Sequence, residues 1–253
     1  MDHPTDRPPL SPHPVLANHY GTAEERVGYI RRLFDRTAAD YDRINDWMSL
    51  NRGESYRREA MIRAGVQPGQ SVLDCACGTG VMAAQAQALV GDAGQVIALD
   101  PSLPMLAIAK ARGVRLRMAG IAEQLALPDR SLDVIAMGYA LRHVADLGVT
   151  FAEFARVLRP GGRLLILEMV PPTSRIGYGL TRFYLKSLVP TLASWVGRSP
   201  DARQLMRYYW DTVDRCVAPE IVIEALREAG FQGVTRSVQF ALLTEYTASR
   251  PDA

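Results

Sequence analysis

The chain contains few cysteines, and this scarcity excludes two classes of protein. Its 253 residues include three of them, Cys75, Cys77 and Cys216. So small and odd a number excludes the dense disulfide framework of a small secreted domain and indicates a reducing compartment. Cys75 and Cys77 have no second Cys or His pair to complete a zinc site, so we expect no metal centre. We interpret both as small residues that line a loop.

Long apolar runs are also missing. No stretch approaches the roughly 20 apolar residues that a membrane-spanning helix needs. The N-terminus lacks the basic-then-apolar layout of a secretory signal, so we expect a cytoplasmic protein. The net charge is only +2, and adjacent arginines occur as isolated pairs, Arg31–Arg32 and Arg57–Arg58. Such pairs are typical of solvated helix faces, and nucleic acid is not an expected partner.

The N-terminal part divides into a tail and a cap. Residues 1–20 are rich in proline and polar side chains, and we predict that they are disordered. Residues 21–253 are predicted to form one domain. Its first part, residues 22–66, has the apolar spacing of amphipathic helices and is predicted to be a helical cap. The cap either buries Tyr41 as a structural residue or closes as a lid over a ligand, and we favour the lid.

Residues 71–172 alternate between short apolar runs and helical segments. Strands are predicted at 71–74, 95–99, 114–118, 132–137 and 163–169, and later near 234–240 and 242–247. Pro101 is predicted to begin one helix, residues 151–158 to form another, and Pro160–Gly162 to form a turn. This alternation indicates an α/β fold with a parallel sheet covered by helices on both faces.

The stretch Ser71–Ala84 carries the strongest functional signal. An apolar run reaches an acid at Asp74, turns on Gly78 and Gly80 and continues as an alanine-rich helix. Glycine allows close approach of a ligand, and the helix N-terminus offers free N–H groups. The segment also fits the dinucleotide pattern, with Asp100 at the expected distance. Asp74, however, repels a phosphate and attracts an amino group, so S-adenosylmethionine fits better than a dinucleotide.

Residues 174–216 interrupt the α/β alternation with apolar helical segments that carry scattered basic side chains. We predict a helical insertion with its second helix at 201–216. Three interpretations stay open: helices packed on the sheet edge, a substrate lid, or an amphipathic surface that contacts a membrane through residues 174–210. We favour the lid.

Four stretches together resemble one family. They are Phe34–Asn45, Val72–Gly80, Tyr139–Val144 and Arg156–Glu168. In these stretches the chain is similar to class I S-adenosylmethionine-dependent methyltransferases of the ubiquinone/menaquinone biosynthesis C-methyltransferase family. The resemblance implies a Rossmann-like, mostly parallel seven-stranded sheet whose last strand is antiparallel. It also implies S-adenosylmethionine as methyl donor, S-adenosylhomocysteine as product and a small-molecule methyl acceptor.

The resemblance also implies where the cofactor binds. Asp74 and the glycine loop would surround its methionine end, Asp100 would bind its ribose, and Gly138 would lie near its sulfonium. Met105 or Leu106 would cover the adenine, and Ile121 and Ala122 would approach the adenine's edge. The predicted cofactor-binding residues are Tyr41, Asp74, Gly78, Thr79, Gly80, Asp100, Pro101, Met105, Ile121, Ala122 and Gly138.

Three residues are candidates for catalysis. Methylation of a ring carbon needs an electron-rich ring, which loss of a phenolic proton provides. Arg142 can stabilise the phenolate, because a nearby cation lowers the pKa of a phenol. His143 can accept the proton, and Tyr41 can position the ring or the cofactor. A structural role stays open as the alternative for two of them: for Arg142 an ion pair with Asp146, and for His143 the capping of a helix.

The chain departs from the family's pattern at Ile121, at His143 and in its C-terminal residues 241–247, which lack a glycine-rich ending. Such variable parts determine the substrate. From the resemblance and from the apolar residues 174–210 we expect a small, apolar aromatic or quinol-type acceptor, methylated at carbon. O- or N-methylation of another metabolite or of a phospholipid amine stays open. A non-catalytic cofactor-binding protein is the alternative of another class.

Overall fold

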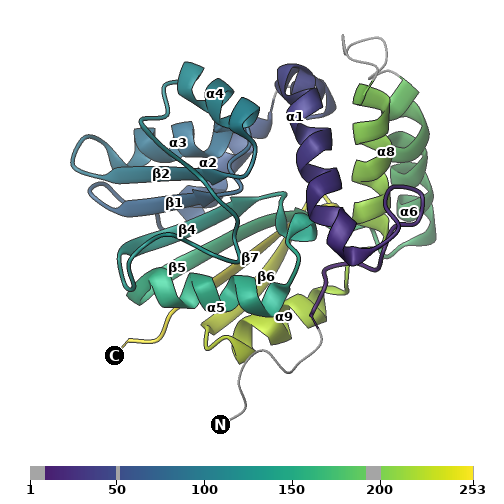
Figure 1. The fold of residues 1–253 in the computed structure, drawn as a ribbon. Helices are drawn as coiled ribbons and strands as arrows, with labels where there is room; N and C mark the ends of the chain where they lie inside the picture. Colours follow the sequence, from purple (N-terminus) through teal and green to yellow (C-terminus); the bar gives the residue numbers. More distant parts are fainter. Residues whose placement is uncertain (1–8, 50–51, 192–200, 253) are drawn as a thin grey trace.

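Seven strands form the sheet that organises the chain, and the computed structural model describes residues 9–49, 52–191 and 201–252 (Figure 1). The strands are β1 (Ser71–Cys75), β2 (Gln95–Asp100), β3 (Leu116–Ala119), β4 (Leu132–Gly138), β5 (Leu158–Met169), β6 (Gln232–Gln239) and β7 (Leu243–Ser249). Their order in the sheet is β3-β2-β1-β4-β5-β7-β6. Strands β1 to β5 run parallel, and β7 is antiparallel to both β5 and β6. The predicted mostly parallel sheet with an antiparallel last strand is confirmed.

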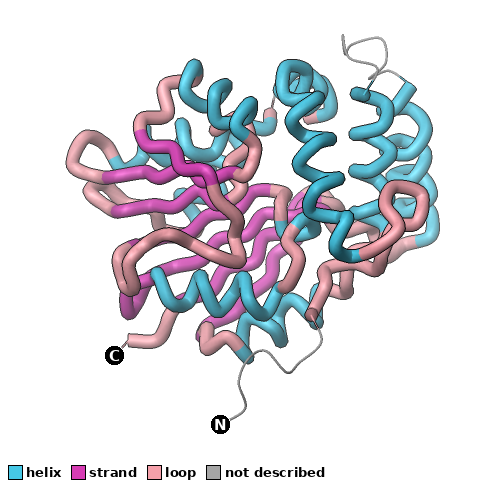
Figure 2. Tube along the Cα trace, in the orientation of Figure 1, coloured by secondary structure: helices cyan, strands magenta, loops and turns pink. Residues whose placement is uncertain are grey.

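Helices cover both faces of this sheet, as predicted (Figure 2). One face carries α2 (Gly53–Arg63), α3 (Val81–Val90) and α4 (Leu103–Ala111), and the other carries α5 (Leu147–Val157) and α9 (Pro219–Glu228). Successive side chains of a strand point to opposite faces. In β1, Val72 therefore packs in the core under α2 and α3, while Leu73 packs in the core under α5 and α9. Helices shield both faces of the sheet from solvent, which explains the continuous apolar runs of the strands.

Two predicted helix starts are wrong. Helix α4 begins at Leu103, not at Pro101, because the hydroxyl of Ser102 accepts a hydrogen bond from the first turn and caps the helix. Helix α5 begins at Leu147, four residues earlier than predicted, because Asp146 caps it in the same way. In both cases the capping side chain, rather than the apolar spacing, sets the boundary.

The predicted turn at Pro160–Gly162 lies inside β5. Gly161 has a φ of +71°, and the pairing of β5 with β4 shifts register between Leu132 and Val134. Between these two positions β4 advances two residues and β5 advances five, from Leu158 to Arg163. Pro160 followed by Gly161 with a positive φ is the pattern of a type II turn, so the predicted turn forms within the span of β5.

A helical layer lies beside the ends of the strands and joins the cap to the insertion. It consists of α1 (Ala23–Met48), α6 (Arg175–Arg182), the π-helical segment η3 (Phe183–Leu188) and α8 (Asp201–Asp214). Ile30 and Leu33 of α1 share one buried cluster with Leu205 and Trp210 of α8. Leu192 and Trp195, predicted to belong to the insertion, lie outside the described residues. Across the described ranges, no helix is long and apolar enough to cross a membrane.

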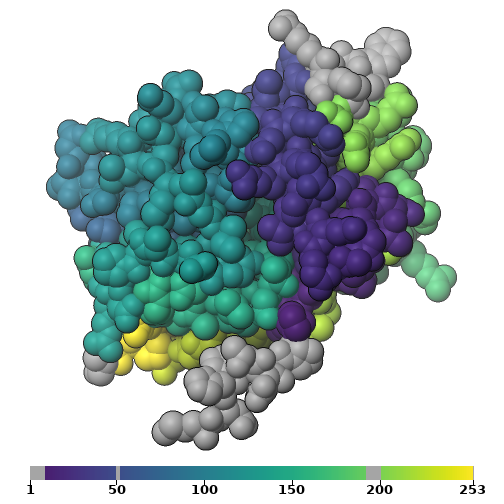
Figure 3. Space-filling view, viewed as in Figure 1, coloured from purple at the N-terminus to yellow at the C-terminus, as the bar shows by residue number. Residues whose placement is uncertain are grey.

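The prediction that residues 1–20 are disordered is wrong for residues 9–20; residues 1–8 lie outside the described part. Leu16 is only 2% exposed and belongs to the cluster of the helical layer. The carbonyls of Leu10 and Pro12 accept hydrogen bonds from Leu147 and Val217, respectively. Figure 3 shows this segment and α1, in purple, against the teal and green parts of the chain. Composition alone missed the few apolar side chains that hold the segment in place.

We predict that Leu16→Ala lowers the free energy of unfolding by about 2–4 kcal/mol, because it removes a buried side chain from a packed cluster. Val15→Ala is the matched control, because Val15 is 42% exposed. Denaturant unfolding measures both. Equal stability of the two variants would show that the segment does not pack in solution.

Candidate active site

The glycine loop between β1 and α3 is built as the sequence predicts. Gly78 and Gly80 have φ of +55° and +78°, which disfavour any side chain. A Cβ at Gly80 would also lie 2.8 Å from the Cβ of Ala109. The backbone N–H of Gly78 donates to Oδ2 of Asp100 at 2.8 Å. The loop therefore connects the carboxyl ends of β1 and β2, where α/β folds bind their ligands.

A polar cavity of about 50 Å³ lies against this loop. Five of the predicted site residues line it: Tyr41, Asp74, Gly78, Thr79 and Gly138. The further lining comprises Asp42, Asn45, Asp46, Ser49, Glu54, Arg57, Ala76, Cys77, Val81 and Met82. Residues from α1, α2, β1, α3 and the end of β4 thus meet around one small polar space.

Four acids line the polar cavity, Asp42, Asp46, Glu54 and Asp74, and of these four Asp74 is the buried one. Its carboxylate is buried, and burial raises its pKa from the ordinary 3.8 to about 7, against the opposing effects of the Ala83 backbone and Arg57. Its Oδ2 atom has no hydrogen-bond partner among the described residues. A buried carboxylate of this kind calls for a cationic partner. The ammonium of the methionine end of S-adenosylmethionine fits this position.

Asp100 lies at the neighbouring strand end. Its two oxygens accept hydrogen bonds from the backbone N–H groups of Ser102 and Gly78, both at 2.8 Å. Burial raises its pKa to about 6. Because each carboxylate oxygen accepts more than one hydrogen bond, the group can still accept from ribose hydroxyls.

The remaining predicted cofactor residues are dispersed. Met105 and Ala122 are buried, whereas Ile121 is exposed. Together with Pro101 they lie outside the described lining of the cavities. Their contacts with an adenine stay a prediction.

Helix α1 is tied directly to the glycine loop. Oγ1 of Thr79 donates to Oδ1 of Asp42 at 2.5 Å, and Arg112 bonds the other oxygen of Asp42 at 2.5 Å and the carbonyl of Thr79 at 3.0 Å. Ser102 donates to Asp35 of the same helix at 2.5 Å. These contacts hold α1 over the polar cavity, in the position that a lid would take.

A larger, apolar cavity of about 320 Å³ adjoins the polar one. The two cavities share Tyr41, Asn45, Ser49 and Arg57 as lining residues. The apolar cavity is further lined by Met48, Arg52, Gly53, Tyr56, Tyr139, Met169, Tyr184, Leu185, Tyr209, Phe240, Leu242 and Leu243. Its volume and its aromatic walls suit a ring-shaped ligand.

Sequence reasoning missed Arg57, which it assigned to a solvated helix face. The side chain lines both cavities, its guanidinium lies 5.0 Å from the centre of the Tyr139 ring, and it donates to the carbonyl of Gly53 at 2.9 Å. Its neighbour Arg58 is exposed. Two adjacent arginines on a helix point in different directions, and only the folded chain shows which one faces the site.

Arg142 does not occupy the predicted position. Its guanidinium is 1% exposed, pairs with Glu168 and donates to Oγ1 of Thr212 at 3.1 Å. It lies 4.3 Å from the centre of the Tyr209 ring, which separates it from the apolar cavity. Burial alone would lower the pKa of Arg142, but the Glu168 carboxylate raises it, so the group stays charged. The suggested pairing with Asp146 is wrong, because Asp146 caps α5.

His143 is enclosed by aromatic rings. Its ring centre lies 5.3 Å from that of Phe34 and 5.5 Å from that of Tyr208, whose hydroxyl is 3.2 Å from Nδ1. Burial lowers its pKa well below the ordinary value. The described lining of the two cavities does not include it. The suggested capping role is wrong, since Asp146 is the cap, and the proton-accepting role stays a prediction.

Two residues of the site have left-handed backbones without being glycine. Ala76, beside the polar cavity, has a φ of +56°, and Tyr139, beside the apolar cavity, has a φ of +61°. Such conformations cost free energy and occur preferentially at functional sites. Here they follow the carboxyl ends of β1 and β4, where the two cavities meet.

The sheet order, the glycine loop and the acids that end β1 and β2 define a class I S-adenosylmethionine-dependent methyltransferase. The structure of a SAM-dependent methyltransferase from Aquifex aeolicus has the same fold, with a TM-score of 0.58 and 18% identity over 82% of this chain and 97% of that one. The model of the ubiE/COQ5 methyltransferase family matches residues 20–245, and the chain belongs to this family. S-adenosylmethionine is its cofactor.

Curated relatives cover most of the chain. It is 36% identical to demethylmenaquinone methyltransferase of Symbiobacterium thermophilum, over 82% of this chain and 86% of the relative. It is 30% identical to ubiquinone/menaquinone biosynthesis C-methyltransferase UbiE of Pseudoalteromonas translucida, over 89% of this chain and 93% of the relative.

We predict that the affinity for S-adenosylhomocysteine depends on the protonation of Asp74. In this prediction the ionised carboxylate of Asp74 binds the ammonium of the ligand. Because the pKa of Asp74 is about 7, the carboxylate becomes protonated as the pH falls below this value, and the ion pair is lost. Affinity should therefore be about tenfold weaker at roughly pH 6 than at pH 8, as calorimetric titration can measure. Asp74→Asn should weaken binding and abolish this slope, leaving only the dependence due to Asp100 below about pH 6.

The pH dependence of the free energy of unfolding, measured without ligand, is the control for this prediction. A raised carboxyl pKa means that the folded protein holds the proton between about pH 4 and 7, so the free energy of unfolding falls as the pH rises through this window. Without ligand, Asp74→Asn should therefore be more stable than the unmodified chain at pH 8. An unchanged pH slope of binding in Asp74→Asn would assign the titration to another group.

Proposed function

We propose that the protein transfers a methyl group to a ring carbon of a hydroxylated aromatic or quinol acceptor held in the apolar cavity. One observation carries this proposal: the apolar cavity shares four lining residues with the polar cavity that fits the cofactor's methionine end. When bound, S-adenosylmethionine supplies an electrophilic methyl group. The named substrates of the relatives, menaquinone and ubiquinone precursors, are ring compounds of this kind.

In this proposal Arg57 activates the ring. It is the cation that lines both cavities, and it lies where the two meet. A guanidinium beside a ring hydroxyl lowers the pKa of that hydroxyl and stabilises the phenolate, which makes the ring carbon nucleophilic. The contact of Arg57 with the Tyr139 ring fixes its direction.

Tyr41 and Arg142 position the reactants. Tyr41 lines both cavities and can orient the ring against the cofactor. Arg142 does not line the apolar cavity but contacts the ring of Tyr209, which does. Arg142 therefore positions this part of the cavity wall. Catalysis then depends mainly on alignment and on exclusion of water by α1 and by Tyr184 and Leu185, which line the apolar cavity. An acceptor with an apolar tail resides in a membrane, which is consistent with the membrane contact that stays open as an alternative for residues 174–210.

The direct test is methyl transfer from isotopically labelled S-adenosylmethionine to demethylated quinols. We predict label on a ring carbon, located by mass spectrometry of the product. Label on oxygen or nitrogen would replace the proposal by O- or N-methylation. Cofactor binding without any labelled product, from quinols or from a fractionated cell extract, would support the non-catalytic alternative.

We predict that Arg57→Met lowers kcat on the order of 100-fold, the usual cost of removing one group that stabilises a developing oxyanion. Arg58→Met is the matched control and should keep kcat within about twofold, because Arg58 is exposed on the same helix. Both variants are assayed at saturating cofactor above pH 8, where Asp74 is ionised. Equal kcat values for the two variants would remove Arg57 from the mechanism.

A further inference from the structure

Helix α6 and the start of η3 expose an apolar stripe. Ile176, Leu180 and Phe183 are 79%, 66% and 62% exposed. At about 100° per residue they fall within about 60° of one another around the helix. Tyr178 lies on the opposite side, where its ring contacts Trp210 and its hydroxyl donates to Asp214 of α8 at 2.7 Å. The helix is therefore anchored by one side and presents large apolar side chains on the other.

Basic residues follow one flank of this stripe. Arg175 and Arg182 both lie about 100–120° from Ile176 in the same direction around the helix, and Lys186 follows in η3. The sequence from residue 170 to residue 200 contains no aspartate or glutamate, although the whole chain has 27 of them. An apolar stripe with basic side chains along one flank is the pattern of helices that lie in the interface of an anionic membrane.

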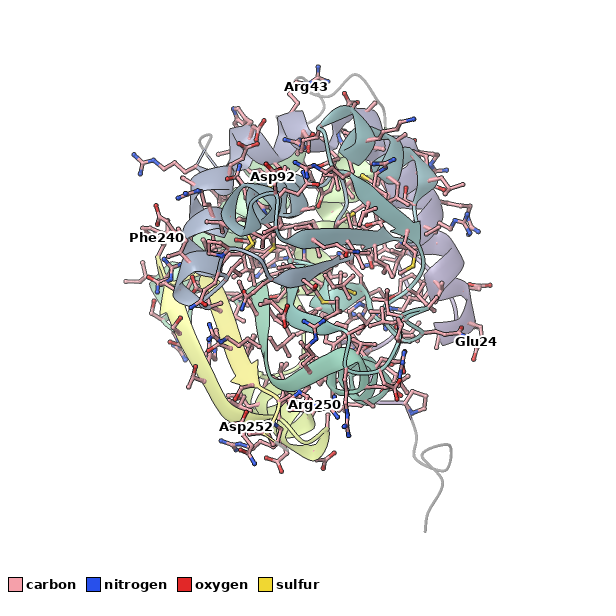
Figure 4. All side chains as sticks on the ribbon, turned by 90° about the vertical axis from the view of Figure 1, so that its left-hand side faces the viewer. Glu24, Arg43, Asp92, Phe240, Arg250 and Asp252 are labelled. Carbon is pink, nitrogen blue, oxygen red and sulfur yellow. The ribbon has the colours of Figure 1, made fainter. Side chains whose placement is uncertain are left out.

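The stripe adjoins the apolar cavity. Tyr184 and Leu185, which follow Phe183 directly, line that cavity. Phe240, 83% exposed, lines it as well and lies at the tip of the β6–β7 hairpin, at the outer edge of the molecule in Figure 4. The cavity is therefore bordered by the exposed Phe240 and by η3, the segment that begins with Phe183 of the stripe.

We propose that the surface formed by Ile176, Leu180 and Phe183 with Arg175, Arg182 and Lys186 docks on an anionic lipid bilayer. The apolar side chains enter the headgroup region, and the basic flank contacts lipid phosphates. In this orientation the apolar cavity receives a lipid-tailed acceptor directly from the membrane. The loading step rests on the proposed function, whereas the docking itself does not.

The basic flank also distinguishes the lipid from a second copy of the chain. A two-fold contact through this surface brings the same patch of each copy together. Arg175, Arg182 and Lys186 of both copies would then lie in one interface, while Asp214, the acid beside this helix, accepts a hydrogen bond from Tyr178 on the anchored side. A bilayer that contains phosphatidylglycerol supplies the missing negative charge.

Docking is tested by cosedimentation of the full chain with phosphatidylcholine vesicles, with and without phosphatidylglycerol. We expect binding that requires phosphatidylglycerol and weakens with salt. It should fall at least tenfold in the double variant Leu180→Ser/Phe183→Ser and in Arg182→Glu. Val149→Ser on α5 and Arg115→Glu, at exposed positions elsewhere, are the controls and should bind like the unmodified chain.

The loading step is tested with two acceptors. The double variant should methylate a water-soluble, short-chain quinol at the unmodified rate and a vesicle-borne, long-chain quinol at least tenfold more slowly. Loss of both activities would point to the active site and overturn the loading step alone. Vesicle binding that is absent, independent of phosphatidylglycerol or unchanged in the variants would overturn the docking. So would a dimer that the double variant dissociates, because a second copy would then occupy the surface.

Discussion

The buried pair of Arg142 and Glu168 is the interaction that joins the two parts of the molecule. Glu168 lies near the end of β5 in the sheet, and Thr212, which accepts a hydrogen bond from Arg142, lies in α8 of the helical layer. The carbonyl of Arg142 also accepts a hydrogen bond from Arg26 of α1 at 2.9 Å. Removing one member of a buried pair leaves the other charge uncompensated, typically at a cost of about 3–5 kcal/mol. The guanidinium of Arg142 therefore connects the sheet to α8, and its backbone carbonyl connects to α1, in addition to the bonds of Asp35 and Asp42 of α1 near the glycine loop.

The two cavities lie where the sheet and the helical layer meet. The polar cavity contains a buried carboxylate, that of Asp74, whose Oδ2 atom has no hydrogen-bond partner among the described residues, and the apolar cavity is walled mainly by aromatic and aliphatic side chains. They meet at Tyr41 and Arg57, which come from the cap rather than from the sheet. The sheet alone thus provides half of a cofactor site, and the helical layer adds the remaining half and the acceptor site.

The sequence predicted the parts of the site that depend on local pattern. The glycine loop, Asp74 and the parallel strands follow from turn chemistry and from apolar runs, and the structure brings Asp74, Gly78 and Thr79 together at one cavity. The role of Arg57 and the partner of Arg142 depend on contacts between distant segments, which no periodicity records. The packing of residues 9–20 was missed for the same reason, because their composition resembles that of a disordered tail.

The N-terminal segment and the sheet order have a consequence for the synthesis of the chain. The carbonyl of Pro12 accepts a hydrogen bond from the backbone N–H of Val217. Strand β7, the last strand to be synthesised, lies between β5 and β6. Contacts so distant in sequence form late, because the loop that they close must first be complete. On the ribosome, β1 to β5 can assemble while the apolar faces of α1 still lack α8. The nascent chain thus exposes these faces until most of the protein has emerged, and this is the interval in which a chaperone has a surface to bind.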